Sequence, residues 1–310
     1  MRRQNFVYKQ NIKNHLFRKK KTMTEYRKAF GSRAMHNSAS GGTQPLDEYF
    51  LKLYCDFHMQ LSFPSSAKMT AGNAVQRLVD LSLGLTFDKK EPIEFDEAKQ
   101  IVEREYSFYK PRTFDDNKDA EEHQEIRQHI HSTAVQAHKG LKEYFGKQKF
   151  TGEKKEFFDV DDIDVPTMYL IDYRSKKKMI DLKTSWSIRN PIKKDGTRTW
   201  RIPKPVKEPS TSQVCQQSVY WKATGLTPAL LFCTADGYEI ATPETTDKLS
   251  EESLEHHYNV VKQRWLVIQN IMKKSFNFDE ALQFVSPDLE RIKSYQGNDF
   301  VKIAKNIWRI

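Results

Sequence analysis

The chain has 310 residues, of which 38% are hydrophobic and 30% are charged, a length that fits one large domain or one domain with appendages. It contains no run near the roughly 18 apolar residues of a membrane helix, which excludes an integral membrane protein. Three isolated cysteines, Cys55, Cys215 and Cys233, exclude a disulfide framework, a zinc ribbon and a four-cysteine iron–sulfur site. This cysteine use indicates a reducing compartment, most simply a cytoplasm.

The net charge is concentrated at the start of the chain. Residues 1–42 contain eleven Lys and Arg residues and one acid, Glu25, whereas the remaining chain has 40 basic and 40 acidic residues. We therefore expect residues 1–45 to form a basic, disordered tail and linker that contacts a polyanion, usually nucleic acid. Three alternatives stay open: a leader without function, upstream sequence before a start at Met23 or Met35, and a mitochondrial presequence.

Helical patterns dominate the region that follows the tail. Apolar residues at three- and four-residue steps predict helices over residues 46–57 and 67–83, and a long helix over 119–146. Four histidines lie in the last of these, and their spacing predicts solvated side chains rather than a metal site. The interpretation is a helical region over residues 46–147.

Near residue 150 the pattern changes to short β-branched and aromatic runs that are typical of strands. These runs predict strands at 157–160, 168–173, 179–184, 229–234 and 238–241. Further helices are predicted at 212–224, with Gly225 as a C-cap, and at 246–274. The order predicts an α/β fold with a central mixed sheet flanked by helices over 148–275, followed by a C-terminal helical extension over 276–310.

Two of the predicted strands form a hairpin within Pro166–Ser185. A turn centred between the two lysines at its tip sets a register in which Asp172 faces Asp181, and directly opposed residues share a face of the sheet. Period-two alternation places Lys183 on that same face, while its neighbours point to the core. We therefore expect two carboxylates and one ammonium to meet on one face of the sheet.

Such a group of charges is suited to holding a metal ion. Two close carboxylates repel each other, and a hard divalent cation removes that conflict. Oxygen ligands favour Mg²⁺ or Mn²⁺ over Zn²⁺. Lys183 would orient or deprotonate the attacking water and offset negative charge on a phosphate. An ordinary surface hairpin with weak ion pairs stays open as the alternative, because Asp-x-Lys is a common tripeptide.

Polar side chains also recur on one face of the predicted helix 212–224. Gln213, Gln216 and Tyr220 lie at positions i, i+3 and i+7, hence on one side. Amides and a phenol on one face are suited to phosphate or sugar oxygens. The alternative is a partly exposed amphipathic helix that packs through its opposite face.

The predicted loop 186–209 combines basic residues with two tryptophans. Basic and aromatic residues beside a metal site are typical of a track for a phosphate backbone with stacked bases. The candidate DNA-binding residues in this loop are Lys193, Lys194, Arg198 and Arg201, in addition to Gln213 on the helix. A merely solvated loop is the alternative.

These motifs resemble the RecB-like branch of the PD-(D/E)xK nucleases. Asp172, then Asp181-Leu182-Lys183, then Gln216-x-x-x-Tyr220 follow the order of that branch's acidic strand end, D/E-x-K strand and Q-x-x-x-Y helix. The likeness is closest to phage-type exonucleases, in which the helix continues into a Tyr-Trp pair and a small-residue turn. It covers about residues 65–275, with the specific motifs inside 72–225.

The resemblance implies a restriction-endonuclease-like core and a Mg²⁺- or Mn²⁺-dependent deoxyribonuclease. Asp172, Asp181 and the Leu182 carbonyl would hold the metal, Lys183 would serve the water, and Gln216 and Tyr220 would position the DNA strand. An exonuclease of recombination or replication is favoured over an endonuclease. The resemblance is also compatible with oligomers, with a partner protein that anneals or binds single strands, and with the cytoplasm of a bacterial or phage-infected host cell.

The sequence departs from the family pattern at two positions. A Gly-x-x-x-His helix motif of the family reads Gly72 to Gln76 here, and an amide is a poor substitute for an imidazole ligand. The glycine usual before the first Asp is Tyr169. Gln76 is therefore kept as an additional site candidate. Glu153 and Glu156 precede the first predicted strand, and Glu156 is kept as well because one of the two would complete a second metal site. The alternative function is a catalytically degraded nuclease-fold module that binds nucleic acid.

Overall fold

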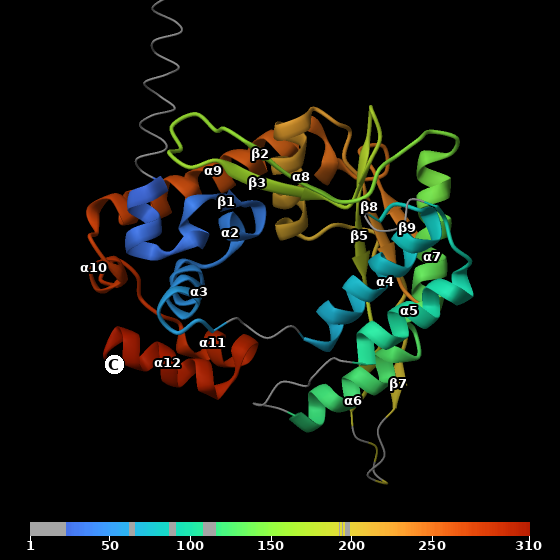
Figure 1. The fold of residues 1–310 in the computed structure, drawn as a ribbon, viewed down its shortest axis with the longest axis horizontal. Coiled ribbons are helices and arrows are strands. Elements are labelled where there is room, and N and C mark those ends of the chain that lie inside the picture. Colours follow the sequence, from blue (N-terminus) through green and yellow to red (C-terminus); the bar gives the residue numbers. More distant parts are fainter. Residues whose placement is uncertain are drawn as a thin grey trace, which may run out of the picture. The chain divides into compact units, whose positions relative to one another are not determined.

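The computed structural model describes residues 23–61, 66–86, 91–107, 116–191, 193, 195 and 199–310 (Figure 1). The chain divides into two compact units, described here one at a time. The first unit comprises the described parts of Met1–Phe63, together with Glu156–Tyr169 and His257–Ile310. The second comprises the described parts of Pro64–Lys155 and Leu170–His256.

The first unit is mainly helical. Its elements before and after the second unit are a helix over 23–30, η1 (Ser32–Met35), α2 (Ala39–Thr43), α3 (Leu46–His58), α10 (Phe278–Leu282), α11 (Leu289–Gln296) and α12 (Asn298–Trp308). Leu51 and Cys55 of α3 pack with Ile292 of α11 and with Phe300 and Ala304 of α12. Residues 276–310 therefore bury an apolar face against α3 within this unit.

The expectation of a disordered tail and linker over residues 1–45 is wrong for residues 23–45. Tyr26 and Phe30 are buried, and residues 39–43 form α2. Gly42 lies in the segment expected to be a linker, but a Cβ there would lie 2.5 Å from Val261 Cγ1 and 2.7 Å from Trp265 Nε1. The glycine thus allows α2 to approach this part of the chain closely. Residues 1–22 lie outside the described residues.

A small sheet in the first unit has the strand order β1-β3-β2. Its strands are β1 (Asn37–Ser38), β2 (Lys154–Phe158) and β3 (Thr167–Ile171). β1 pairs in parallel with β3, with Asn37 opposite Thr167. The boundary between the two units falls within β2, within β3 and within the long helix α9 (Glu251–Lys274).

Four helices precede the main sheet of the second unit: α4 (Ala67–Leu83), α5 (Phe95–Ser107), α6 (Asp116–Arg127) and α7 (Ile130–Phe145). The single helix predicted over 119–146 is therefore two helices, separated by a turn at residues 128–129. The histidines there are not uniformly solvated, because His123 is buried and stacks on Tyr106 with ring centroids 4.5 Å apart.

The main sheet of the second unit is mixed, with the order β4-β5-β8-β9. Its strands are β4 (Tyr173–Arg174), β5 (Met179–Thr184), β8 (Leu230–Cys233) and β9 (Tyr238–Ala241). β5 is antiparallel to β4 and parallel to β8, and β8 is antiparallel to β9. The protein is therefore an α/β protein.

Strand alternation gives the two faces of this sheet different partners (Figure 1). Ile180, Leu231 and Cys233 lie in one core with helices α4 to α7. Leu230 and Phe232 pack instead with Val214 of α8 (Thr211–Thr224). Because Asp181 is paired with Leu230 and Lys183 with Phe232, the charged residues of β5 share the α8 face.

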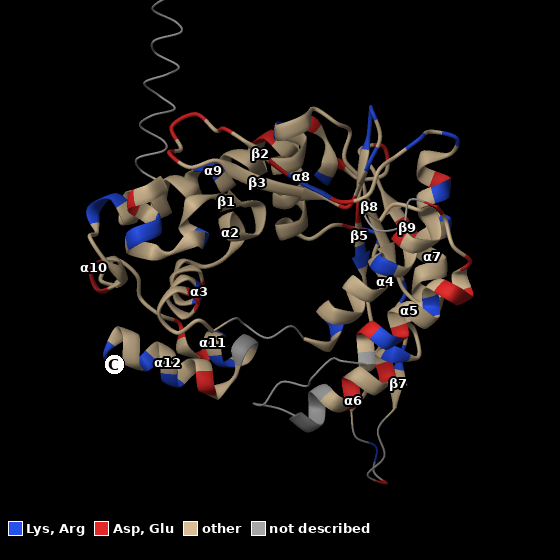
Figure 2. Cartoon of the chain, in the orientation of Figure 1, with Lys and Arg blue, Asp and Glu red and all other residues tan. Residues whose placement is uncertain are grey.

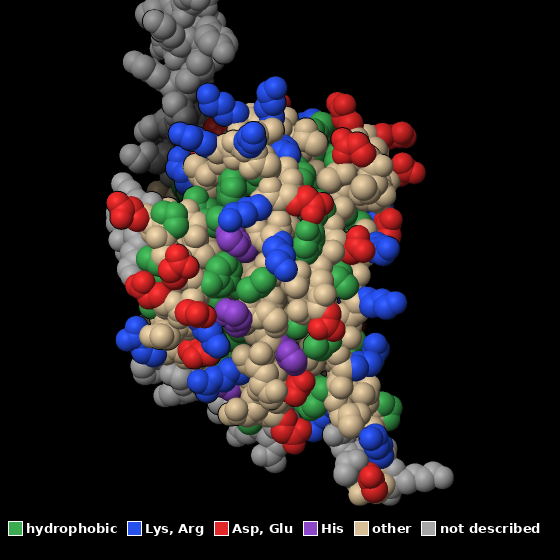
Figure 3. Space-filling model, turned by 90° about the vertical axis from the view of Figure 1, so that its right-hand side faces the viewer, with side chains coloured by type: hydrophobic (Ala, Val, Ile, Leu, Met, Phe, Trp, Pro, Cys, Tyr) green, Lys and Arg blue, Asp and Glu red, His purple; other side chains and the backbone are tan. Residues whose placement is uncertain are grey.

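A short hairpin, β6 (Ile188–Arg189) and β7 (Trp200–Arg201), and the 3₁₀ turn η2 (Asp247–Leu249) complete the second unit. Acidic and basic residues are interspersed along α5, whereas α6 carries mainly acidic residues (Figure 2). The face drawn in Figure 3 likewise mixes both signs of charge. Of the helices described, none combines the length and the apolar composition that crossing a membrane requires.

Candidate functional site

The predicted hairpin register is confirmed. Tyr173 pairs with Ile180 and Arg174 with Met179, and Ser175 N donates to Lys178 O across the turn. The next position along brings Asp172 beside Asp181, whose Oδ1 accepts a 3.4 Å hydrogen bond from Asp172 N.

The Asp172 carboxylate makes a second contact with β5. Its Oδ2 accepts a 2.7 Å hydrogen bond from Leu182 N, one residue beyond Asp181. Burial, and next the Asp181 carboxylate, raise the pKa of Asp172 well above its usual value, although Lys183 and the Leu182 amide oppose the shift. The two carboxylates thus meet in a setting that disfavours two full negative charges.

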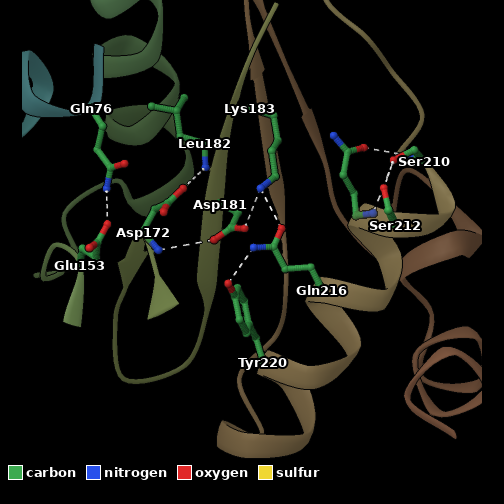
Figure 4. Close-up of polar contacts among 11 residues, drawn as sticks. Gln76, Glu153, Asp172, Asp181, Leu182, Lys183, Ser210, Ser212, Gln216 and Tyr220 are labelled. Atoms are coloured by element: carbon green, nitrogen blue, oxygen red, sulfur yellow. Dashed lines mark hydrogen bonds and ion pairs between the residues drawn. The ribbon is translucent and has the colours of Figure 1, made fainter. Parts of the chain in front are cut away.

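Lys183 lies at the centre of the site (Figure 4). Its ammonium donates to Asp181 Oδ2 at 3.0 Å and to Gln216 Oε1 at 2.9 Å. Burial by itself would lower the pKa of Lys183, but the Asp181 and Asp172 carboxylates outweigh it and raise the pKa. Lys183 is therefore held as a cation between β5 and α8.

Gln216 and Tyr220 extend this chain of contacts along α8. Gln216 Nε2 donates a 2.7 Å hydrogen bond to the Tyr220 hydroxyl, one helical turn away. Tyr220 is 4% exposed, and burial together with the negative charge of Asp181 raises its pKa. Both side chains therefore lie on the face of α8 that is directed to Asp181 and Lys183.

Local sequence explains where α8 begins and ends. Ser210 and Gln213 form a reciprocal capping box, in which Gln213 Oε1 accepts from Ser210 N at 2.8 Å. Gly225 ends the helix in the left-handed conformation, with φ 67°, as its prediction as a C-cap required. The amide oxygen of Gln213 is therefore used by the helix cap, and contact between Gln213 and DNA stays a prediction.

Glu153 raises the pKa of two other carboxyl groups in the second unit, those of Asp172 and Asp80. Gln76 Nε2 donates to Glu153 Oε2 at 3.1 Å, so the residue at the family's His position binds a carboxylate. Asp80 follows Gln76 by one helical turn, and burial raises its pKa to about 6, with Glu153 contributing in the same direction. Asp80 was not predicted as a site residue, and its electrostatic partners are Tyr173, Glu153 and Arg77 rather than the Asp172–Asp181 pair.

The remaining predicted site residues lie in the first unit, on the β6–β7 hairpin of the second unit, or outside the described residues. Glu156 belongs to the first unit, where its Oε2 accepts a 2.9 Å hydrogen bond from the Tyr169 hydroxyl. Lys193 and Arg201 are exposed in and beside the β6–β7 hairpin. Lys194 and Arg198 lie outside the described residues.

A groove of about 940 Å³ borders the site. Lys183 forms part of its wall, and α4, β6, the segment before α8 and η2 supply other parts. The groove lies entirely within residues of the second unit. A ligand in it would reach Lys183 directly.

The oxygen atoms of Asp172, Asp181 and Leu182 suit a divalent cation. Asp172, Asp181 and the Leu182 carbonyl offer only oxygen, which is what Mg²⁺ and Mn²⁺ prefer. Among the described residues no protein donor reaches Asp172 Oδ1, whereas the other three carboxylate oxygens of the pair accept hydrogen bonds. Within the same residues no three His, Cys, Asp or Glu side chains are placed to hold a metal by themselves. The pair fits a cation that keeps water ligands.

Comparison of the chain with protein families, with curated proteins and with solved structures finds no match. The chemistry of the site is therefore inferred from its own geometry and from the order of its motifs along the chain.

Proposed function

We propose that this protein is a Mg²⁺- or Mn²⁺-dependent DNA nuclease with a restriction-endonuclease-like core, and that it acts as an exonuclease in recombination or replication. The observation that carries the proposal is the chain of contacts Asp172–Asp181–Lys183–Gln216–Tyr220, which joins a β-hairpin to a helix far along the sequence. An ordinary surface hairpin has no need of a helix face that holds its lysine.

In this proposal Asp172, Asp181 and the Leu182 carbonyl hold the divalent cation. The cation supplies Lewis-acid stabilisation of charge that develops on a phosphate. Lys183 adds a fixed positive charge beside the same phosphate and orients the attacking water. Gln216 keeps the ammonium in place, and Tyr220 keeps Gln216 in place. Gln216 and Tyr220 therefore preorganise the site, because their contacts exist before the substrate arrives.

The alternative function is a catalytically degraded module that binds nucleic acid. It is favoured by one observation: Gln76, at the position of a metal-ligating His in the resembling family, is hydrogen-bonded to Glu153. The full pairing of Lys183 with Asp181 and Gln216 favours the nuclease instead, since a module that only binds has no need for this arrangement.

The test is incubation with end-labelled linear DNA and with circular DNA, in Mg²⁺, in Mn²⁺ or in EDTA. The expected result is metal-dependent release of label from linear DNA, with circular DNA resistant. Lys183→Ala should abolish cleavage. The matched control is Lys222→Ala, which should not abolish it; Lys222 lies in the same unit and forms an ion pair with Glu255. Cleavage by a folded Lys183→Ala protein would refute the role of Lys183. DNA binding without cleavage by the unaltered protein would favour the degraded module.

A further inference from the structure

The second unit contains a cavity whose lining includes none of the candidate site residues. Its volume is about 440 Å³, and residues of α4, α5, α6 and α7 line it. This volume lies within the range of about 300–1,000 Å³ that is usual for sites that bind small molecules. We refer to it as the α4–α7 pocket.

Part of the lining of the α4–α7 pocket is apolar and belongs to the core. Leu78, Val102, Tyr106 and Ile130 line the pocket and are each at most 6% exposed. The ring of Tyr106 is also held by its stacking on His123. These walls therefore exist before a ligand arrives, and they offer apolar surface to a planar or hydrocarbon group.

The other part of the lining is polar and comes mainly from the end of α6 and the start of α7. Gln124, Arg127 and Gln128 are exposed, and within the part of the chain that the structure describes their side chains make no hydrogen bond or ion pair. His131 Nε2 is buried, again without a partner among the described residues. A few polar groups set beside apolar walls are what fixes the orientation of a ligand in a pocket.

The charges of the pocket favour an anion. Lys99 and Glu103 lie one helical turn apart on α5 and pair at 3.9 Å, so their charges offset each other. Arg127 has no carboxylate paired with it among the described residues, and its positive charge is therefore uncompensated there. A guanidinium can donate two parallel hydrogen bonds to a phosphate, which makes arginine well suited to bind a phosphate ester.

We propose that the α4–α7 pocket binds a nucleoside monophosphate. Its phosphate meets Arg127, its base lies against the apolar walls, and the amides of Gln124 and Gln128 contact the edge of the base. A glutamine amide presents one donor and one acceptor side by side, a pattern that pairs with adenine.

Other small anions fit the lining less well. Inorganic phosphate satisfies Arg127 but leaves the apolar walls without a contact. A fatty acid satisfies Arg127 and the walls but leaves the amides of Gln124 and Gln128 without one. A nucleoside monophosphate uses all three parts of the lining.

This inference does not depend on the proposed function, because neither the carboxylate pair nor Lys183 lines the pocket. It adds a link to that function, however. An exonuclease that acts on DNA releases nucleoside monophosphates, so the ligand of the α4–α7 pocket has the chemistry of the expected product.

Isothermal titration calorimetry of the full chain with dAMP, in EDTA, measures binding without cleavage. We expect dAMP to bind at least about ten-fold more tightly than deoxyadenosine, which lacks the phosphate, or inorganic phosphate, which lacks the base. Decanoate is the fourth probe. Absence of dAMP binding, equal affinity for inorganic phosphate, or tighter binding of decanoate would overturn the proposal.

Variants locate the bound nucleotide. Arg127→Gln should weaken dAMP binding about ten- to a hundred-fold, the scale of lost hydrogen bonds to a charged group, and leave deoxyadenosine binding nearly unchanged. The matched control is Arg104→Gln, because Arg104 is also exposed, lies on α5 and does not line the pocket. A thermal melt shows whether each variant folds. Equal affinities of the two folded variants for dAMP would contradict the assignment.

A second variant tests the contact with the base. Gln128→Leu should weaken the binding of dAMP and of deoxyadenosine by the same factor, about three- to ten-fold, because both ligands carry the base. An unchanged affinity for both would show that Gln128 does not contact the ligand and would contradict the orientation proposed.

Lys183→Ala separates the α4–α7 pocket from the proposed catalytic site. It should bind dAMP as tightly as the unaltered protein does. Loss of dAMP binding in Lys183→Ala, with retention in Arg127→Gln, would place the nucleotide beside Lys183 and overturn the inference. Binding that depends on Arg127 without any metal-dependent cleavage of DNA would refute the proposed nuclease and leave the pocket assignment standing. Cleavage without dAMP binding would do the reverse.

Discussion

Lys183 Nζ and Gln216 Oε1 lie 2.9 Å apart, although the two residues are separated by 33 positions in the chain. This contact fixes the lysine ammonium between a strand and a helix that meet only in the folded protein. A lysine has a long flexible side chain, so a second acceptor besides Asp181 restricts it to one position.

Gln216→Leu removes this acceptor, and we expect cleavage to fall by about ten- to a hundred-fold, the scale of a lost positioning contact near the reacting group. The measurement is the initial rate of label release from linear DNA in Mg²⁺.

The adjacent Gln217→Leu is the control for Gln216→Leu. Gln217 is fully buried, and within the described residues neither atom of its amide has a hydrogen-bond partner. Its replacement should leave cleavage unchanged and raise the free energy of unfolding by about 1–3 kcal/mol. A Gln216→Leu protein as active as the Gln217→Leu protein would show that the Lys183–Gln216 contact has no role in the reaction.

Tyr220→Phe removes the oxygen that accepts from Gln216 Nε2 and keeps the ring that fills the core. We expect a loss of cleavage of about ten-fold, with a change in the free energy of unfolding no larger than about 1.5 kcal/mol, the usual net value of one hydrogen bond. Parallel urea titrations and cleavage rates test this. A variant that loses stability but keeps its rate would make Tyr220 a packing residue only.

Stability should depend on pH through His138. Its Nε2 is buried without a hydrogen-bond partner among the described residues, and burial, with Lys142 contributing, lowers its pKa from 6.5 to about 4. Because the folded state disfavours the protonated ring, the free energy of unfolding is highest above pH 6.5 and falls as the pH drops towards 4. We expect a loss on the order of 2 kcal/mol over this window, after allowance for partial solvent screening.

His138→Gln should remove that part of the pH dependence. Urea unfolding at pH 7.5 and pH 4.5 measures the difference, and His256→Gln, at an exposed position, is the control. If the two variants respond identically to pH, His138 is not the group responsible.

The basic charge of residues 1–22 predicts an effect on DNA affinity. These residues contain eight Lys and Arg residues and no acid. If three or four of them meet phosphates, deleting 1–22 should reduce the slope of log affinity against log salt by about 2–4 units. The deletion spares Tyr26 and Phe30, which are buried. Cleavage at low salt should survive, and an unchanged slope would show that these residues do not bind DNA.

Much of the site could be predicted because it depends on local rules. The hairpin turn and period-two alternation were sufficient to place Asp172 beside Asp181, with Lys183 on the same face. Helical spacing was sufficient to put Gln216 and Tyr220 on one side of α8. These features involve residues close in sequence, for which backbone geometry determines direction.

Other features were decided only by the tertiary structure. Composition predicts a tail and linker up to residue 45, but Gly42 packs where a side chain would not fit. The pairing of Gln76 with Glu153 and the groove beside Lys183 both depend on segments that are distant in the chain. Charge and hydropathy patterns describe which face of an element is buried, but they do not say which other element buries it, because that is determined by packing between elements.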